Sequence, residues 1–194
     1  MHFLLLLLLS ALLTGCVTKP MATNGKPDLA LQQRLTEIQR WDASGKLAVR
    51  STNNSESARL QWLQNGEQFD IQLSGPAGLK ATRIHGTPND VNFEQGEQRV
   101  HAASVEELSQ QLIGWPLPAA QLTWWLRGLP APKPSPQKAS YAAEGWLAEL
   151  EQDGWTIHFS DPQQPAPRIT LPGRIDATRG ELRITLIIKT WQLD

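Results

Sequence analysis

The feature that most constrains this fold is a repeated alternation of apolar and polar residues in short segments. Leu47 and Val49 alternate with small or charged neighbours, and Phe69, Ile71 and Leu73 alternate with polar ones. Further strands are expected at residues 58–62, 79–85, 91–93 and 169–171. Turn-forming pairs such as Asn-Gly and Asp-Gly separate the segments. Successive side chains of a strand point to opposite faces, so each segment has one apolar face. The pattern predicts antiparallel strands that bury one face and expose the other.

Three segments show helical spacing instead. Asp28 is a helix-capping residue, and the apolar residues that follow it predict a helix over residues 29–41. Ser104 and Glu107 have the spacing of a capping box, which predicts the start of a second helix. A third predicted helix follows and ends at Gly128.

Strand patterns return in the C-terminal part of the chain. The segments 146–150, 155–159 and 182–193 alternate, and the phase of the last one slips near Lys189, which predicts a β-bulge. The proline-rich residues 162–167 predict a loop. The order of helix, strands, two helices and more strands predicts a mainly β protein with helices (α+β). The strands outnumber what a small flat sheet needs, so we expect a strongly curved sheet with helices over its mouth.

The N-terminus carries an apolar run that is too short to span a membrane as a helix. The run from Phe3 to Leu13 has the length of a signal-peptide core, whereas a spanning helix needs about 20 residues. The residues Leu13-Thr14-Gly15-Cys16 then resemble a bacterial lipobox. Small residues let the backbone enter a protease cleft, and the thiol of Cys16 receives diacylglycerol. The absence of Lys and Arg before the run departs from the usual signal.

Cys16 is the only cysteine of the chain, so it has no partner for a disulfide. The alternative reading is an incidental thiol at the end of an ordinary signal peptide. We expect a signal peptide over residues 1–15, a lipidated N-terminus and tether over 16–27, and a single domain over 28–194. Val17 stands where Asp retains lipoproteins in the inner membrane of enteric-type bacteria. It therefore predicts a lipid-anchored protein of the outer membrane that faces the periplasm.

Composition and motifs exclude several classes of function. The chain has 18 basic and 19 acidic residues, which argues against a nucleic-acid surface. His85, His101 and His158 lack the spacing of a metal site. The sequence contains no nucleophile elbow and no phosphate-cradling glycine loop. We therefore expect no cofactor, no metal and no enzymatic activity.

Several short segments resemble one known family, in the same order along the chain. The central pair is GWPLP at residues 114–118 and LTWWLRGLP at residues 122–130. Supporting segments are GKLAVR (45–50), RLQW (59–62), GPAG (75–78), DGW (153–155) and LRITLIIKTW (182–191). Together with the lipobox, this ordered set resembles the LolB family of outer-membrane lipoprotein receptors, over nearly the whole mature chain.

The resemblance implies an unclosed antiparallel β-barrel with a helical lid, similar to the fold of the periplasmic carrier LolA. Its apolar cavity would hold the acyl chains of a lipoprotein delivered by LolA and then release them into outer-membrane lipid. We expect a monomer. Two alternatives stay open: an envelope lipoprotein that binds another lipid, and a structural envelope lipoprotein with a filled core.

The candidate cavity residues are apolar side chains expected to face inward from the strands and the helices. They are Leu47, Val49, Leu60, Trp62, Phe69, Ile71, Leu73, Leu112, Trp115, Leu122, Trp125, Leu126, Ile157, Ile184 and Leu186. Taken alone, apolar stripes favour an ordinary core, and most buried tryptophans are structural. Only the resemblance favours a cavity at these positions.

The turn formed by Gly75, Pro76, Ala77, Gly78 and Leu79 is the predicted membrane-insertion loop. The family places a bulky apolar residue directly after the proline, where it projects into solvent and helps to insert cargo. This chain departs from the family because the position holds Ala77. Leu79 either takes over that role or points into the sheet.

Overall fold

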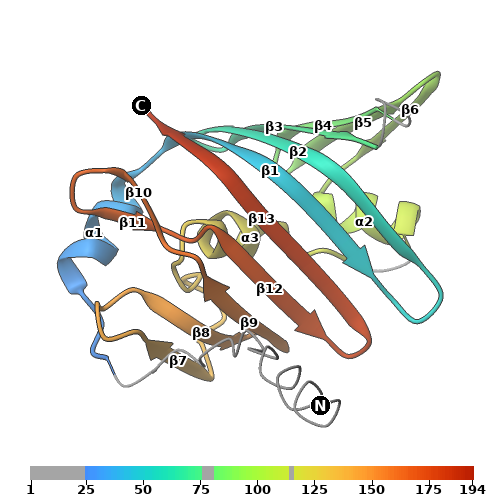
Figure 1. Ribbon diagram of the computed structural model, residues 1–194. Helices are drawn as coiled ribbons and strands as arrows, with labels where there is room; N and C mark the ends of the chain where they lie inside the picture. The colour runs from blue at the N-terminus through green and yellow to red at the C-terminus, as the bar shows by residue number, and fades with distance from the viewer. Residues whose placement is uncertain (1–24, 76–80, 114–115) are drawn as a thin grey trace, which may run out of the picture.

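The fold is built on one eleven-stranded antiparallel sheet (Figure 1). The structure is a computed structural model, and it describes residues 25–75, 81–113 and 116–194. The order across the sheet is β6-β5-β4-β3-β2-β1-β13-β12-β9-β8-β7. These strands are β1 (Arg40–Arg50), β2 (Ser55–Asn65), β3 (Gln68–Ser74), β4 (Thr82–Thr87), β5 (Asp90–Gln95), β6 (Gln98–Ala102), β7 (Lys138–Tyr141), β8 (Leu147–Gln152), β9 (Trp155–Ser160), β12 (Arg174–Arg179) and β13 (Leu182–Leu193). The sheet is curved (Figure 1). Its edge strands β6 and β7 do not pair with each other, so the sheet does not close into a barrel. This confirms the predicted fold class.

The described residues also contain three helices: α1 (Leu29–Glu37), α2 (Val105–Ile113) and α3 (Ala119–Leu126). Helices α2 and α3 lie on the concave side of the sheet (Figure 1). The predicted capping box is present, since Ser104 Oγ accepts a hydrogen bond from the Glu107 amide at 3.1 Å. The Glu107 carboxylate in turn accepts one from the Ala103 amide at 3.0 Å. No helix in the described residues is long and apolar enough to cross a membrane.

Helix α1 is shorter than predicted. Asp28 caps it, accepting a hydrogen bond from the Leu31 amide at 2.9 Å, but the backbone becomes extended at Ile38. The prediction that the helix continues to Trp41 is therefore wrong. Trp41 lies in β1, where its ring centroid is 5.6 Å from that of Trp62 and 5.5 Å from that of Trp191. Packing among three neighbouring strands outweighs the helical spacing of the preceding residues.

The predicted bulge is present at Lys189. Ser44 of β1 pairs with Thr190 of β13, whereas the next residue, Gly45, pairs with Ile188. A Cβ atom on Gly45 would lie 1.9 Å from the carbonyl oxygen of Ile187. Glycine is therefore required where the bulged strand approaches β1.

Four strands were not predicted from the sequence, namely β6, β7, β10 (Gln163–Ala166) and β12. The predicted loop over residues 162–167 is wrong, because β10 pairs there with β11 (Ile169–Leu171) in a separate two-stranded sheet. These strands are short and contain few apolar residues, so they lack the alternation that identified the others. Each of them is held by backbone pairing with the strand directly before or after it in the chain, and β12 also pairs with β9.

Candidate functional site: an apolar cavity

A cavity of about 520 Å³ lies between the concave face of the sheet and the helical segments. This volume falls within the roughly 300–1,000 Å³ of typical small-ligand pockets. Its sheet wall is made of inward-facing residues of β1, β2, β3, β4 and β13, and its helical wall comes from the segment around α2 and α3. The apolar side chains of the wall include Trp41, Leu47, Val49, Leu60, Trp62, Phe69, Ile71, Leu73, Ile84, Val105, Leu117, Leu122, Trp124, Ile184 and Leu186.

Strand periodicity explains why these side chains meet. In β3, Phe69, Ile71 and Leu73 point inward, and the register pairs Ile71 with Trp62 of β2 and Ile84 of β4. Each alternate residue therefore adds to one continuous apolar surface. The curvature of the sheet keeps this surface away from full contact with the helices, which leaves the cavity between them.

The structure brings ten of the predicted cavity residues together in the wall. They are Leu47, Val49, Leu60, Trp62, Phe69, Ile71, Leu73, Leu122, Ile184 and Leu186. Leu112 is partly buried against the hydrophobic core and does not line the cavity. Trp115 and residues 76–79 of the predicted insertion loop lie outside the described residues, whereas Gly75 directly follows β3.

Trp125, Leu126 and Ile157 lie in the solid core instead of the cavity wall, which corrects their predicted place. Trp125 packs against Trp155 with ring centroids 6.1 Å apart. Its indole Nε1 donates to Oε1 of the fully buried Gln152 at 2.8 Å. Helix α3 therefore contacts β8 and β9 directly, while its other side faces the cavity.

Several residues of the cavity wall were not among those predicted from the sequence. Ile84 continues the alternation of a predicted strand and could have been found by that signal. Val105, Leu117 and Trp124 belong to helical segments whose packing the sequence does not reveal. Arg127 also lines the cavity, and no apolar pattern could identify a charged residue there.

Arg127 is placed by the C-terminal end of α3. Gly128 has a positive φ of 72°, and its amide donates to the Trp125 carbonyl at 2.9 Å. The Leu129 amide donates to the Trp124 carbonyl at 3.1 Å, which completes a Schellman motif. The motif turns Arg127 inward, and burial lowers the pKa of its guanidinium group. The group stays charged at neutral pH because arginine titrates far above it.

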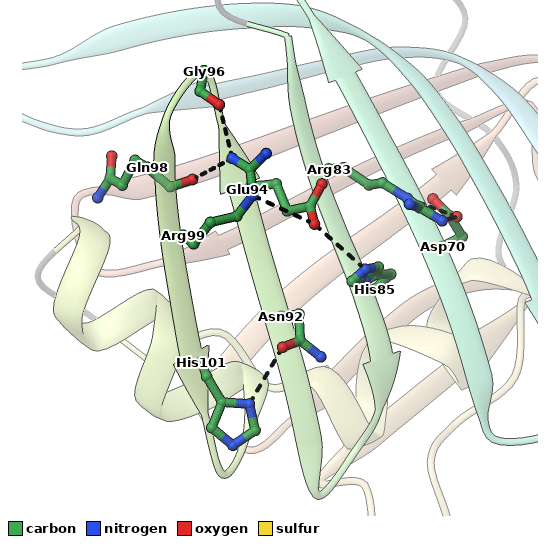
Figure 2. A network of polar contacts seen from close by, with 9 residues as sticks. All are labelled: Asp70, Arg83, His85, Asn92, Glu94, Gly96, Gln98, Arg99 and His101. Carbon is green, nitrogen blue, oxygen red and sulfur yellow. Dashed lines mark hydrogen bonds and ion pairs between the residues drawn. The ribbon is translucent and has the colours of Figure 1, made fainter.

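The outer face of the same sheet is polar (Figure 2). The Arg83 guanidinium lies 2.6 Å from the Asp70 carboxylate, and this hydrogen bond lowers the pKa of Asp70 below its ordinary value. On the neighbouring strands, Glu94 lies 4.0 Å from His85 and 3.6 Å from Arg99. These charged side chains make the outer face of β3, β4, β5 and β6 polar, in contrast to the inner face.

The described residues contain no group of three or more His, Cys, Asp or Glu side chains placed to hold a metal ion. His85, His101 and His158 all lie on the outer face of the sheet, at positions that pair with Asp70, Asn92 and Asp176. The cavity on the inner face is distinguished by its mainly apolar lining.

Two solved structures have a similar fold, an antiparallel sheet with helices. The crystal structure of a LolA superfamily protein from Nitrosomonas europaea matches with a TM-score of 0.54 at 10% identity, covering 84% of this chain and 93% of that one. A DUF1329 family protein from Desulfovibrio piger matches with a TM-score of 0.52 at 7% identity, covering 84% and 88%. At these identities the likeness concerns the fold alone.

Residues 39–191 match the protein family described as "Outer membrane lipoprotein LolB". The outer-membrane lipoprotein LolB of Cellvibrio japonicus is 43% identical over 98% of this chain and 96% of its own length. The LolB of Pseudomonas syringae pv. syringae is 41% identical over 95% of this chain and 92% of its own length. The chain belongs to the LolB family of outer-membrane lipoproteins, which confirms the resemblance found in the sequence.

Proposed function

We propose that this chain is the outer-membrane receptor that takes acylated lipoproteins from a LolA-type periplasmic carrier and releases them into the membrane. The observation that carries the proposal is the apolar cavity of about 520 Å³. A cavity on one side of α3 favours lipid binding over a structural lipoprotein whose core is filled throughout. Apolar walls with few polar groups suit hydrocarbon chains, because burying apolar surface is favourable and non-directional.

The energetics of acyl chains explain why such a receptor is needed. Each methylene exposed to water costs roughly 0.8 kcal/mol, so a triacylated protein cannot cross the periplasm unaided at a useful rate. A cavity replaces the bilayer by burying the same apolar area. Transfer proceeds without a nucleotide if the receptor binds the acyl chains more tightly than the carrier does, and if the bilayer holds them more tightly than the receptor does. The proposal therefore assigns the protein no catalysis.

The N-terminal residues give the proposed receptor its place at the membrane. We propose that residues 1–15 are removed and that Cys16 carries the acyl anchor. Several acyl chains hold a protein on a membrane far longer than one chain does. A tether over residues 16–27 would join this anchor to the domain, and its last part is attached there, since the Gly25 amide donates to the Tyr141 carbonyl at 3.0 Å. The domain over residues 28–194 could then meet a soluble carrier without leaving the bilayer surface.

A transfer experiment tests the proposal. A LolA-type carrier loaded with acylated lipoprotein is mixed with the chain from residue 16 onward that carries Cys16→Ala, and the location of the cargo is followed by pull-down. We expect the cargo to move to the receptor. Leu73→Asp should abolish transfer because it places a carboxylate in the cavity wall, whereas Ser74→Asp on the opposite face of β3 should leave it unchanged. Cargo that stays on the carrier with the unsubstituted domain refutes the proposal.

The insertion loop gives the proposal a second test. Leu79 lies outside the described residues, and its role in membrane insertion remains a prediction. We expect Leu79→Glu to accept cargo from the carrier normally but to insert it slowly into vesicles, since a carboxylate resists entry into the bilayer. Insertion at the normal rate by this variant would refute the role of Leu79.

A further inference from the structure

The cavity wall contains two charged residues, and they differ in their surroundings. Glu67 is exposed to solvent. Arg127 is only 7% exposed, so its guanidinium group sits where the wall is otherwise mostly apolar. A charge that is removed from water is costly unless other groups compensate for the lost hydration. The guanidinium group of Arg127 therefore requires hydrogen-bond partners.

Backbone carbonyls satisfy part of the guanidinium group. Nε donates to the Thr123 carbonyl at 3.1 Å, and Nη1 donates to the carbonyls of Leu35 and Ile38 at 3.0 and 2.9 Å. The group also lies over the ring of Trp124, with Cζ 4.9 Å from the ring centroid. These contacts fix the guanidinium plane at the junction of α1 and α3.

The second terminal nitrogen of Arg127, Nη2, differs from Nε and Nη1 in its surroundings. Among the described residues, Nη2 has no hydrogen-bond partner, and Arg127 forms no ion pair. Nη2 is also absent from the fully enclosed polar atoms that lack a partner, so it retains accessible surface. A positively charged donor on the cavity wall thus has unused hydrogen-bonding capacity.

We propose that Arg127 is the head-group-binding residue of the cavity, with Nη2 donating to a carbonyl oxygen at the head of a bound acyl chain. The inference rests on the proposed function, because it requires an acyl chain in the cavity. An acyl ester or amide offers a carbonyl acceptor at the point where the hydrocarbon begins. A plain hydrocarbon would leave Nη2 unpaired, so the site selects acyl compounds over hydrocarbons of the same length.

Three fluorescent probes with the same chain test the inference: the methyl ester of pyrenedodecanoic acid, the free acid, and dodecylpyrene. The protein is the chain from residue 16 onward with Cys16→Ala, which keeps every described residue. We expect it to bind the ester and the acid more tightly than the hydrocarbon. Arg127→Met should weaken the ester and the acid by about tenfold or more, which corresponds to a hydrogen bond from a charged donor. Its affinity for the hydrocarbon should not change.

A matched control separates this effect from the general loss of an arginine. Arg34 donates through Nε to the Arg168 carbonyl at 3.0 Å and does not line the cavity. Arg34→Met should leave the affinities for all three probes unchanged. An equal loss of all three probes in Arg127→Met would instead show that Arg127 only holds α1 against α3, and the inference would be overturned.

The remaining outcomes distinguish the inference from the function on which it rests. If the unsubstituted protein binds dodecylpyrene as tightly as the ester, the inference fails and the acyl cavity stands. If it binds none of the probes, the proposed function fails together with the inference. Should Arg127→Met not fold, the ester labelled with carbon-13 at its carbonyl still decides the question. Its infrared carbonyl frequency should be lower in the unsubstituted protein than in hexadecane, and an unshifted frequency overturns the inference.

Discussion

Filling the cavity should weaken acyl-chain binding without unfolding the protein. Ile71 lies in the middle of β3, with its side chain in the cavity wall between Trp62 and Ile84. Ile71→Trp adds about six non-hydrogen atoms at this position. If these atoms displace two or three methylenes of a bound chain, at roughly 0.8 kcal/mol each, binding loses about 2 kcal/mol. The dissociation constant then rises roughly 30-fold.

The assay is a titration with a fluorescent fatty acid, run beside thermal unfolding of the same samples. Gln72→Trp is the matched control, because Gln72 is the next residue of β3 and points to the outer face. We expect the control to bind the probe normally and both variants to remain folded. Unchanged affinity in Ile71→Trp, or an equal loss in both variants, would show that the cavity is not where the chain binds.

Three further predictions concern the stability of the fold. Gln152→Met should lower the free energy of unfolding by about 3 kcal/mol, because Trp125 Nε1 and other buried groups lose their partner; a melting temperature within a degree of the parent would contradict this. Arg83→Gln should raise the pKa of Asp70, as NMR titration can measure. The stability that Arg83 contributes is then present above pH 3.8 and lost as the pH falls through the lower pKa of the folded state; a difference that did not shrink with falling pH would argue against the pairing. Ser104→Ala removes a helix cap and should cost about 1 kcal/mol in urea unfolding, and an unchanged midpoint would rule out that contribution.

Sequence patterns predicted the regular parts of this fold well. The alternation in β3 and β13 follows from packing on one side of a sheet, so it can be read without knowing the neighbouring strands. The bulge at Lys189 was also predictable, because an extra residue shifts the phase of the alternation. In contrast, β10 was predicted as a loop, because prolines within and beside it are typical of loops and hide its pairing with the adjacent strand β11.

The candidate site was predictable only in part. The sequence identifies which residues of a strand share a face, but it does not say whether that face meets a helix or an empty space. Ile157 and Ile71 have the same pattern, yet Ile157 packs in the solid core and Ile71 lines the cavity. Arg127 could not be found from apolar periodicity, because its place depends on the end of α3 and on carbonyls of α1.

The direct packing of α3 on β8 and β9 has a consequence for repeated rounds of binding and release. Trp125, Trp155 and Gln152 form a dense half that does not depend on anything occupying the other half. We therefore expect the ligand-free protein to keep its fold after it releases a lipoprotein. Successive rounds of delivery then need no refolding step, and the turnover rate can be set by the rate at which lipoproteins arrive.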